Sequence, residues 1–106
     1  MYADITSGSS YDFTPPFKIE FNFEKLNKVE ANTTIRLFDQ SNNHFNPWIT
    51  QTGHYVIDVK ANRVDWSING QAQTGQDITL GTSFVEFLMT PNASIKFSNF
   101  MIYKLQ

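Results

Sequence analysis

The chain lacks cysteine and has neither a strong net charge nor a long apolar run. It has 106 residues, with 8 Lys and Arg against 10 Asp and Glu, and a formal net charge of -2. Without cysteine there can be no disulfide, thiolate nucleophile or cysteine-ligated zinc. The near-neutral charge, without a basic run, argues against a nucleic-acid-binding protein. No apolar run approaches the roughly 20 residues of a membrane-spanning helix, so we expect no membrane insertion.

Motifs of common enzyme classes are also missing, including G-x-S-x-G, H-E-x-x-H and a phosphate-binding glycine loop. His44 and His54 do not have the spacing of metal ligands, so we expect neither a metal nor a cofactor. Four carboxylates fall on predicted polar strand faces: Glu20, Asp58, Asp65 and Glu86. Paired carboxylates leave a small glycan hydrolase as an alternative. A solvated sheet face explains them more simply, and we expect a protein that is not an enzyme.

Aromatic residues are abundant, with ten Phe, four Tyr and two Trp. Residues 17–24 alternate strictly between apolar and polar side chains, which predicts a strand with one buried face. The same alternation over residues 64–68 places Trp66 on the apolar face, and therefore in the core. A chain of this length forms one domain with a substantial core. Large aromatic side chains are expected to fill that core.

A β-hairpin is the most clearly marked element. Residues 54–60 and 63–68 are rich in β-branched and aromatic residues and flank the dipeptide Ala61-Asn62. Asn69-Gly70 follows, and Asn-Gly is the strongest short-range signal for a tight turn between strands. We therefore expect two antiparallel strands, followed by a polar stretch over residues 71–81 with a short return strand.

Further strands are predicted before and after the hairpin. The expected strands cover residues 33–38, 83–89 and 93–105, and in the last the alternation shifts near Ser98-Asn99. Such a shift indicates a β-bulge or a strand covered on both sides. Residues 25–32 form at most one helical turn. The pattern predicts one all-β module over residues 1–106, an antiparallel β-sandwich or barrel.

The N-terminal residues 1–16 are expected to be a partly irregular lead-in. Ile5 and Tyr11 are candidates for a short edge strand within it. Pro15-Pro16 marks its end, because proline cannot donate a hydrogen bond to a sheet.

The stretch 39–48 holds the main candidate site. It reads Asp-Gln-Ser-Asn-Asn-His-Phe-Asn-Pro-Trp, and we expect residues 39–46 to form a loop. Polar groups that bind hydroxyls, together with an aromatic face for the C–H side of a ring, are typical of sugar recognition. We therefore expect Trp48 to stack on a sugar and Asp39, Asn43 and His44 to supply hydrogen bonds, with Arg36 in a secondary position. The alternative is that Trp48 plugs the end of the sandwich and the Asn and Asp residues make turns.

A second polar surface is predicted on the strands around the hairpin. Its residues are Arg36, Asp58, Arg63, Asp65 and Ser67. If their strands are neighbours in a curved sheet, these side chains floor a shallow polar groove. The alternative is a set of cross-strand ion pairs, each worth well under about 1 kcal/mol.

Three segments also carry a resemblance to a known group of domains. They are residues 16–21, residues 64–70 (Val-Asp-Trp-Ser-Ile-Asn-Gly) and residues 95–105, which end in an apolar-Tyr-x-Leu pattern. In this order they resemble strands of the concanavalin-like jelly rolls, which include laminin-G-like domains and many carbohydrate-binding modules. The resemblance implies a jelly-roll sandwich. A calcium site is common in that group, but no dense Asp cluster supports one here.

The resemblance implies a function as well as a fold. Compact modules of this group occur on tail and baseplate proteins of phages, where they bind cell-wall polysaccharide. We therefore expect a non-catalytic carbohydrate-binding module at the cell exterior or on a virion surface, with a cell-surface polysaccharide as partner. Weak single sites would favour a trimer or multicopy display. The alternative function is a structural or protein-interaction domain of a larger assembly.

Overall fold

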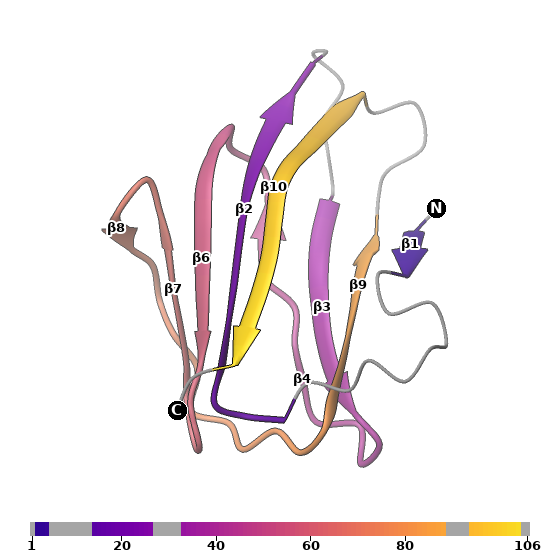
Figure 1. The fold of residues 1–106 in the computed structure, drawn as a ribbon, viewed down its shortest axis with the longest axis vertical. Coiled ribbons are helices and arrows are strands. Elements are labelled where there is room, and N and C mark those ends of the chain that lie inside the picture. Colours follow the sequence, from indigo (N-terminus) through magenta and orange to yellow (C-terminus); the bar gives the residue numbers. More distant parts are fainter. Residues whose placement is uncertain (1, 5–13, 27–32, 89–93, 105–106) are drawn as a thin grey trace.

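The computed structural model describes residues 2–4, 14–26, 33–88 and 94–104. Within these ranges all regular structure is β, and no helix is present (Figure 1). A helix long and apolar enough to cross a membrane is accordingly not found in the described residues. The strands are β1 (Tyr2–Asp4), β2 (Phe17–Lys25), β3 (Thr33–Asp39), β4 (His44–Phe45), β5 (Trp48–Ile49), β6 (Gly53–Val59), β7 (Val64–Ile68), β8 (Gln71–Ala72), β9 (Ser83–Leu88) and β10 (Ile95–Lys104).

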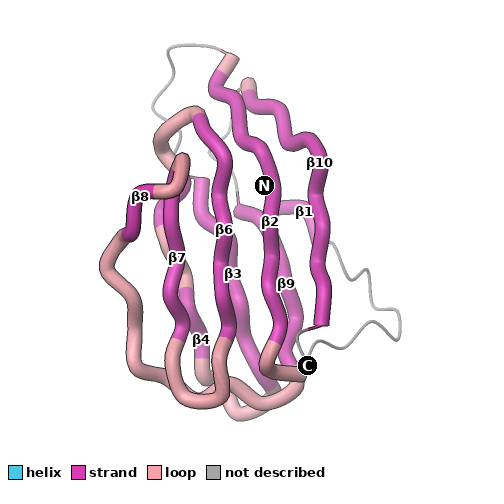
Figure 2. The backbone as a smooth tube through the Cα atoms, turned by 60° about the vertical axis from the view of Figure 1, so that its left-hand side comes forward, coloured by secondary structure: helices cyan, strands magenta, loops and turns pink. Residues whose placement is uncertain are grey.

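The strands form two antiparallel sheets of five strands each. Sheet A has the order β1-β9-β3-β4, and β5 also pairs with β3. Sheet B has the order β10-β2-β6-β7-β8. Figure 2 shows the strands of sheet B as one layer in front of those of sheet A. The expected all-β, antiparallel architecture is confirmed.

Both sheets contribute side chains to one hydrophobic core. On β2, the alternating residues Phe17, Ile19, Phe21 and Phe23 are at most 1% exposed, as the sequence pattern predicts. Sheet A adds buried residues of β3, β4 and β5 to the same cluster. The ring of Phe21 stacks on that of Tyr55 with centroids 5.2 Å apart. Such aromatic pairs add to the free energy gained by burying their area.

Trp66 packs against this core, as expected from its place on the apolar face of β7. Its indole Nε1 donates a hydrogen bond of 2.8 Å to the carbonyl oxygen of Thr74. A partly buried indole needs such an acceptor, because its N–H would otherwise lose its bond to water.

The predicted hairpin is present as β6 and β7. The two strands pair from Tyr55↔Ile68 to Val59↔Val64. After β7, Asn69 and Gly70 have φ angles of 52° and 81°, the left-handed conformation that asparagine and glycine tolerate best. This turn leads into β8, the expected short return strand.

Strand β10 contains the expected irregularity. Its pairing with β2 shifts register between Ser98 and Met101, and Asn99 has a φ of 52°. The sequence shift therefore marks a β-bulge.

Two other local expectations have a different outcome. Residues 39–46 were expected to form a loop, but residues 44–45 pair with β3 as β4, and residues 48–49 pair with β3 as β5. In the stretch 25–32, where at most one helical turn was expected, Lys25 ends β2 and residues 27–32 lie outside the described residues. The edge-strand candidates Ile5 and Tyr11 also lie outside them. Residues 2–4 form β1, which pairs with β9 at the edge of sheet A.

Candidate functional site

Strand β3 and its two short partners position the candidate residues. Ile35, Leu37 and Asp39 are buried, so the alternating residues Arg36 and Phe38 face the other side of sheet A. In register, Trp48 pairs with position 34 and His44 with position 38. Cross-strand partners lie on the same face of a sheet. Arg36, His44 and Trp48 therefore share the outer face of sheet A.

Trp48 is held outward on β5. Its two neighbours in the chain, Pro47 and Ile49, are buried, whereas Trp48 is 61% exposed. It is the most exposed of the large hydrophobic residues that the structure describes. The alternative that Trp48 plugs the end of the protein is therefore wrong. Its buried neighbours fix the backbone and leave the indole ring in solvent.

Arg36 lies between Trp48 and His44 on this face, diagonally across from each. Diagonal neighbours on a sheet have Cα atoms about 7–8 Å apart, within reach of long side chains. The guanidinium carbon of Arg36 lies 4.6 Å from the ring centroid of Phe38, a cation–π contact. We call Arg36, Phe38, His44 and Trp48 the Trp48 face.

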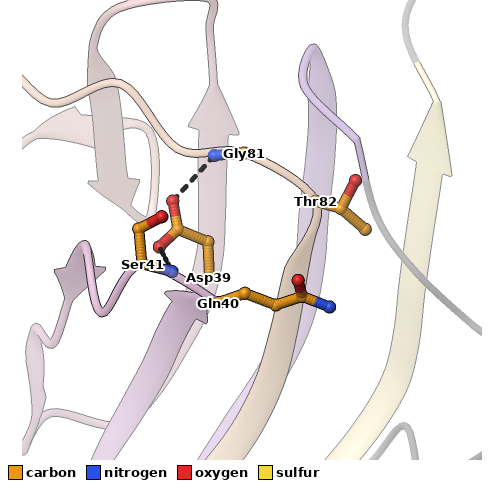
Figure 3. A pocket seen from close by; sticks show the side chains of 5 residues that line it. All are labelled: Asp39, Gln40, Ser41, Gly81 and Thr82. Carbon is orange, nitrogen blue, oxygen red and sulfur yellow. Dashed lines mark hydrogen bonds between the residues drawn. The ribbon is translucent and has the colours of Figure 1, made fainter.

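Asp39 faces the opposite way, into the protein. Its side chain is buried, and its two oxygens accept four hydrogen bonds of 2.9 to 3.0 Å. Figure 3 shows those from Ser41 and Gly81. Oδ1 accepts from the backbone N–H groups of Ser41 and Asn43, and Oδ2 accepts from Asn43 Nδ2 and the backbone N–H of Gly81. A carboxylate offers about four lone-pair directions, so these donors use them all. Asp39 therefore anchors its loop.

The same hydrogen bonds lower the pKa of Asp39. The backbone N–H of Gly81 has the largest effect, followed by the side chain of Asn43, because both stabilise the ionised form. Asp39, Gln40, Ser41, Gly81 and Thr82 line a polar hollow of about 310 Å³ beside this carboxylate. The hollow lies at the end of β3 remote from Trp48, since the register partner of Trp48 is at position 34.

The candidate residues thus divide into two groups. Arg36, His44 and Trp48 share the outer face of sheet A, while Asn43 belongs to the loop that the buried Asp39 anchors. At a rise of about 3.4 Å per residue, Asp39 lies about 17 Å along β3 from the position that pairs with Trp48.

The predicted polar groove around the hairpin does not form as expected. Arg36 belongs to sheet A, whereas Asp58, Arg63, Asp65 and Ser67 belong to the hairpin region of sheet B. The groove required neighbouring strands, and these strands lie in different sheets.

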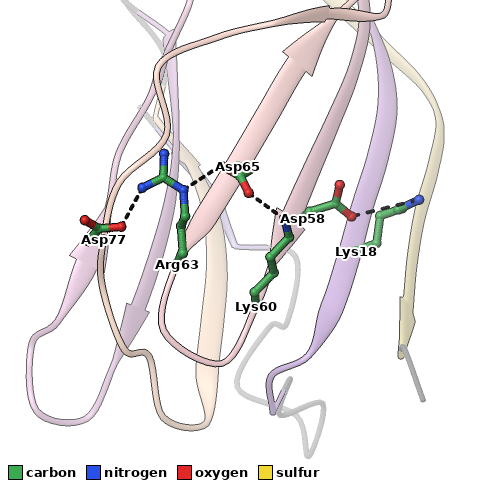
Figure 4. Close-up of polar contacts among 6 residues, drawn as sticks. All are labelled: Lys18, Asp58, Lys60, Arg63, Asp65 and Asp77. Carbon is green, nitrogen blue, oxygen red and sulfur yellow. Dashed lines mark hydrogen bonds and ion pairs between the residues drawn. The ribbon is translucent and has the colours of Figure 1, made fainter.

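Ion pairs link the charged residues of sheet B instead (Figure 4). The contacts are Lys18–Asp58 at 3.9 Å, Lys60–Asp65 at 2.6 Å, Arg63–Asp65 at 2.8 Å and Arg63–Asp77 at 2.5 Å. Lys60 first, and then Arg63, lower the pKa of Asp65 by stabilising its charge. The side chains are well exposed, and exposed pairs contribute little to stability. The alternative of surface ion pairs describes this region.

A further polar network lies on the outer face of sheet B, and the sequence did not reveal it. His54 Nε2 is 2.8 Å from Glu20 Oε2, and His54 Nδ1 is 2.7 Å from Asn22 Oδ1. Tyr103 donates its hydroxyl proton to Glu20 Oε1. This bond has the largest effect in lowering the pKa of Glu20, and His54 lowers it further. Both ring nitrogens of His54 therefore have a partner. The network joins three strands, because Glu20 lies on β2, His54 on β6 and Tyr103 on β10.

Neither a metal centre nor a known relative accounts for these surfaces. In the described part of the chain, no group of three or more His, Cys, Asp or Glu side chains could hold a metal ion. No protein-family model, curated protein or solved structure matches the chain. The geometry of the two outer faces is therefore what bears on function.

Proposed function

We propose that this protein is a non-catalytic carbohydrate-binding module that binds a polysaccharide through the Trp48 face. The observation that carries the proposal is the exposed indole on β5, whose backbone is fixed by buried neighbours. A rigid aromatic ring in solvent suits the C–H face of a pyranose. The resemblance to jelly rolls agrees with this function, and we propose that the two sheets form a sandwich of that kind.

His44 supplies a hydrogen-bonding group beside the ring. Its Nδ1 lies 3.0 Å from the carbonyl oxygen of Asn42. A carbonyl oxygen can only accept, so Nδ1 carries the proton, and Nε2 of the neutral ring remains an acceptor. A sugar hydroxyl can donate to it. Arg36 flanks the same face.

Asn43 and Asp39 have a different part in this proposal. Asn43 gives its Nδ2 to Asp39. Its amide oxygen has no hydrogen bond within the described residues and can accept one from a ligand. Asp39 acts as a positioning residue, because its carboxylate is already fully bonded.

The partner we propose is a cell-surface polysaccharide, and the place is the cell exterior or the tail of a phage that recognises its host. One aromatic platform with few hydrogen bonds gives weak binding to a short oligosaccharide. A polysaccharide repeats its epitope, so a trimer or multicopy display would raise the effective affinity by orders of magnitude.

An NMR titration of isotope-labelled protein with fragments of bacterial cell-wall polysaccharides tests the proposal. We expect saturable shifts of the Trp48 indole N–H together with the amides of residues 39–46. Trp48→Ala should weaken binding at least about tenfold, the loss typical of removing a stacking aromatic. Met101→Ala is the matched control, since Met101 is 44% exposed but lies on sheet B.

Two results would contradict the proposal. One is a fragment panel that moves no resonance of the Trp48 face, and the other is a Trp48→Ala variant that binds as well as the wild type. Either would favour the alternative of a structural or protein-interaction domain.

A further inference from the structure

A hollow of about 260 Å³ lies on the outer face of sheet B. The end of β2 and the starts of β6 and β10 surround it. The side chains that matter for the argument are Asn22, Glu24, Thr52, Lys96 and Ser98. None of these residues belongs to the Trp48 face, because they lie on sheet B or next to it.

Lys96 and Glu24 are an uncommitted pair of opposite charges at this hollow. They are cross-strand register partners on β10 and β2, and both are exposed. Within the described residues, neither side chain forms a hydrogen bond or ion pair, unlike Lys18, Lys60 and Arg63 of the same sheet. The hollow therefore has a free ammonium donor next to a free carboxylate acceptor.

This pair favours one class of ligand. A hydroxyl group can accept a hydrogen bond from an ammonium and donate one to a carboxylate at the same time. Glu24 would repel a simple anion, and Lys96 would repel a simple cation. Neutral molecules with several hydroxyl groups satisfy both side chains, and sugars are such molecules.

The polar network beside the hollow holds its floor in place. Asn22 Oδ1 is 2.7 Å from His54 Nδ1, and Glu20 fixes the other nitrogen of that ring. The amide Nδ2 of Asn22 and the hydroxyl of Ser98 form no hydrogen bond within the part of the chain that the structure describes. They add a donor and a donor–acceptor group to the hollow. Asn22, whose side chain is held by His54, loses little entropy when a ligand binds.

We propose that this hollow is a second carbohydrate-binding site, and that one chain is therefore bivalent. The inference rests on the proposed function, because it assigns the same ligand class to a second surface. The two sites lie on opposite outer faces, with the shared core between them, and the shortest dimension of the molecule is 22 Å. A short oligosaccharide in one site cannot reach the other. Two sites on one chain would therefore join two polysaccharide strands.

The same labelled protein and fragments test this proposal. We expect a second set of saturable shifts, in the amides of residues 22–24, 52–54 and 96–98, and a stoichiometry of two fragments per chain. The double variant Glu24→Gln/Lys96→Met should weaken this second set about tenfold or more, because hydrogen bonds to charged groups are lost. Its shifts around Trp48 should be those of the wild type.

Trp48→Ala should show the converse, losing the shifts around Trp48 and keeping those of the hollow. Lys104→Met is the matched control for the Lys96→Met substitution of the double variant, since Lys104 is an exposed lysine at the other end of β10.

The outcomes separate the two proposals. Shifts around Trp48 alone, with one fragment bound per chain, overturn the second site and leave the proposed function intact. Shifts in the hollow alone support the site on sheet B and overturn the role of Trp48. If no fragment of the panel moves either set, both proposals fail.

Discussion

Asp39 and Trp48 open and close the same polar stretch, but the structure gives them opposite roles. Asp39 ends β3 on its inward-facing side and accepts four hydrogen bonds from its own loop and from Gly81. Trp48 pairs with an outward-facing position of the same strand and is 61% exposed. The polar residue is buried and the large apolar residue is in solvent, the reverse of what their chemistry alone suggests.

Side chains along a strand alternate between the buried and the outer face of the sheet. The difference between Asp39 and Trp48 shows that this alternation decides which residues a ligand can reach. A carboxylate whose lone pairs are all used by the protein contributes to stability. An indole that is mostly in solvent contributes little to stability and is available for binding. Mutations at the two positions should therefore separate stability from binding.

Asp39→Ala should cause a larger loss of stability than any substitution on the two outer faces. It leaves the N–H groups of Ser41, Asn43 and Gly81 without their acceptor, and unpaired polar groups in a partly buried site are costly. We expect the melting temperature to fall by on the order of 10 °C. Thermal unfolding followed by circular dichroism measures it.

The neighbouring residue provides the control for Asp39. Gln40 is exposed and borders the same hollow. Gln40→Ala should leave the melting temperature nearly unchanged. Equal losses for the two variants would show that Asp39 is no anchor.

The dependence of stability on pH gives the second, smaller test of Asp39. Its pKa in the folded protein lies below the ordinary value of 3.8. The carboxylate therefore stabilises the fold fully above that value, and this contribution is lost as the pH falls through the lowered folded-state pKa. Asp39→Asn cannot titrate, so its deficit in melting temperature should be constant near neutral pH and shrink below about pH 4.

Melting curves of the wild type and Asp39→Asn between about pH 7 and about pH 2 give this comparison. Glu20 and Asp65 also have lowered pKa values, but they titrate in both proteins and cancel in the difference. A difference that stays constant over the whole range would contradict the role given to Asp39.

Much of the fold could be predicted because it depends on local alternation. The period of two in residues 17–24 and 64–68 identified β2 and β7 and their buried faces. Asn69-Gly70 identified a turn, and the interrupted alternation near Ser98 identified the bulge in β10. Strands as short as β4 and β5 contain too few residues to show a period, so they were missed.

The site was less predictable because it depends on long-range pairing. Residue types suggested Trp48 and His44, but not that Asp39 faces inward, although an Asp side chain commonly accepts a hydrogen bond from the backbone N–H two residues on. The network of Glu20, His54 and Tyr103 requires β10 to lie beside β2, and these two strands are far apart in the chain. Nothing in the local sequence specifies that pairing.

The polar network around His54 on sheet B should contribute less to the free energy of unfolding than Asp39 and more than Trp48. His54→Ala removes the contacts to Glu20 and Asn22, but these side chains are partly exposed and can bond to water instead. We expect a loss of about 1 kcal/mol in the free energy of unfolding. Urea unfolding measures it, and Ser67→Ala, on the same face, is the control. A loss as large as that of Asp39→Ala would place a main stability determinant on this surface.

Trp48→Ala should have the smallest effect on stability and a large one on binding. The ring is mostly in solvent, so its removal should change the free energy of unfolding by less than about 0.5 kcal/mol, as for surface substitutions generally. Thermal unfolding of this variant beside Asp39→Ala completes the comparison. If Trp48→Ala melts well below the wild type, its indole packs against the protein, and a loss of sugar binding would then have a structural explanation. If Trp48→Ala has the melting temperature of the wild type while Asp39→Ala has a lower one, the exposed ring has no structural role at β5. Weaker sugar binding by Trp48→Ala would then reflect the loss of a direct contact.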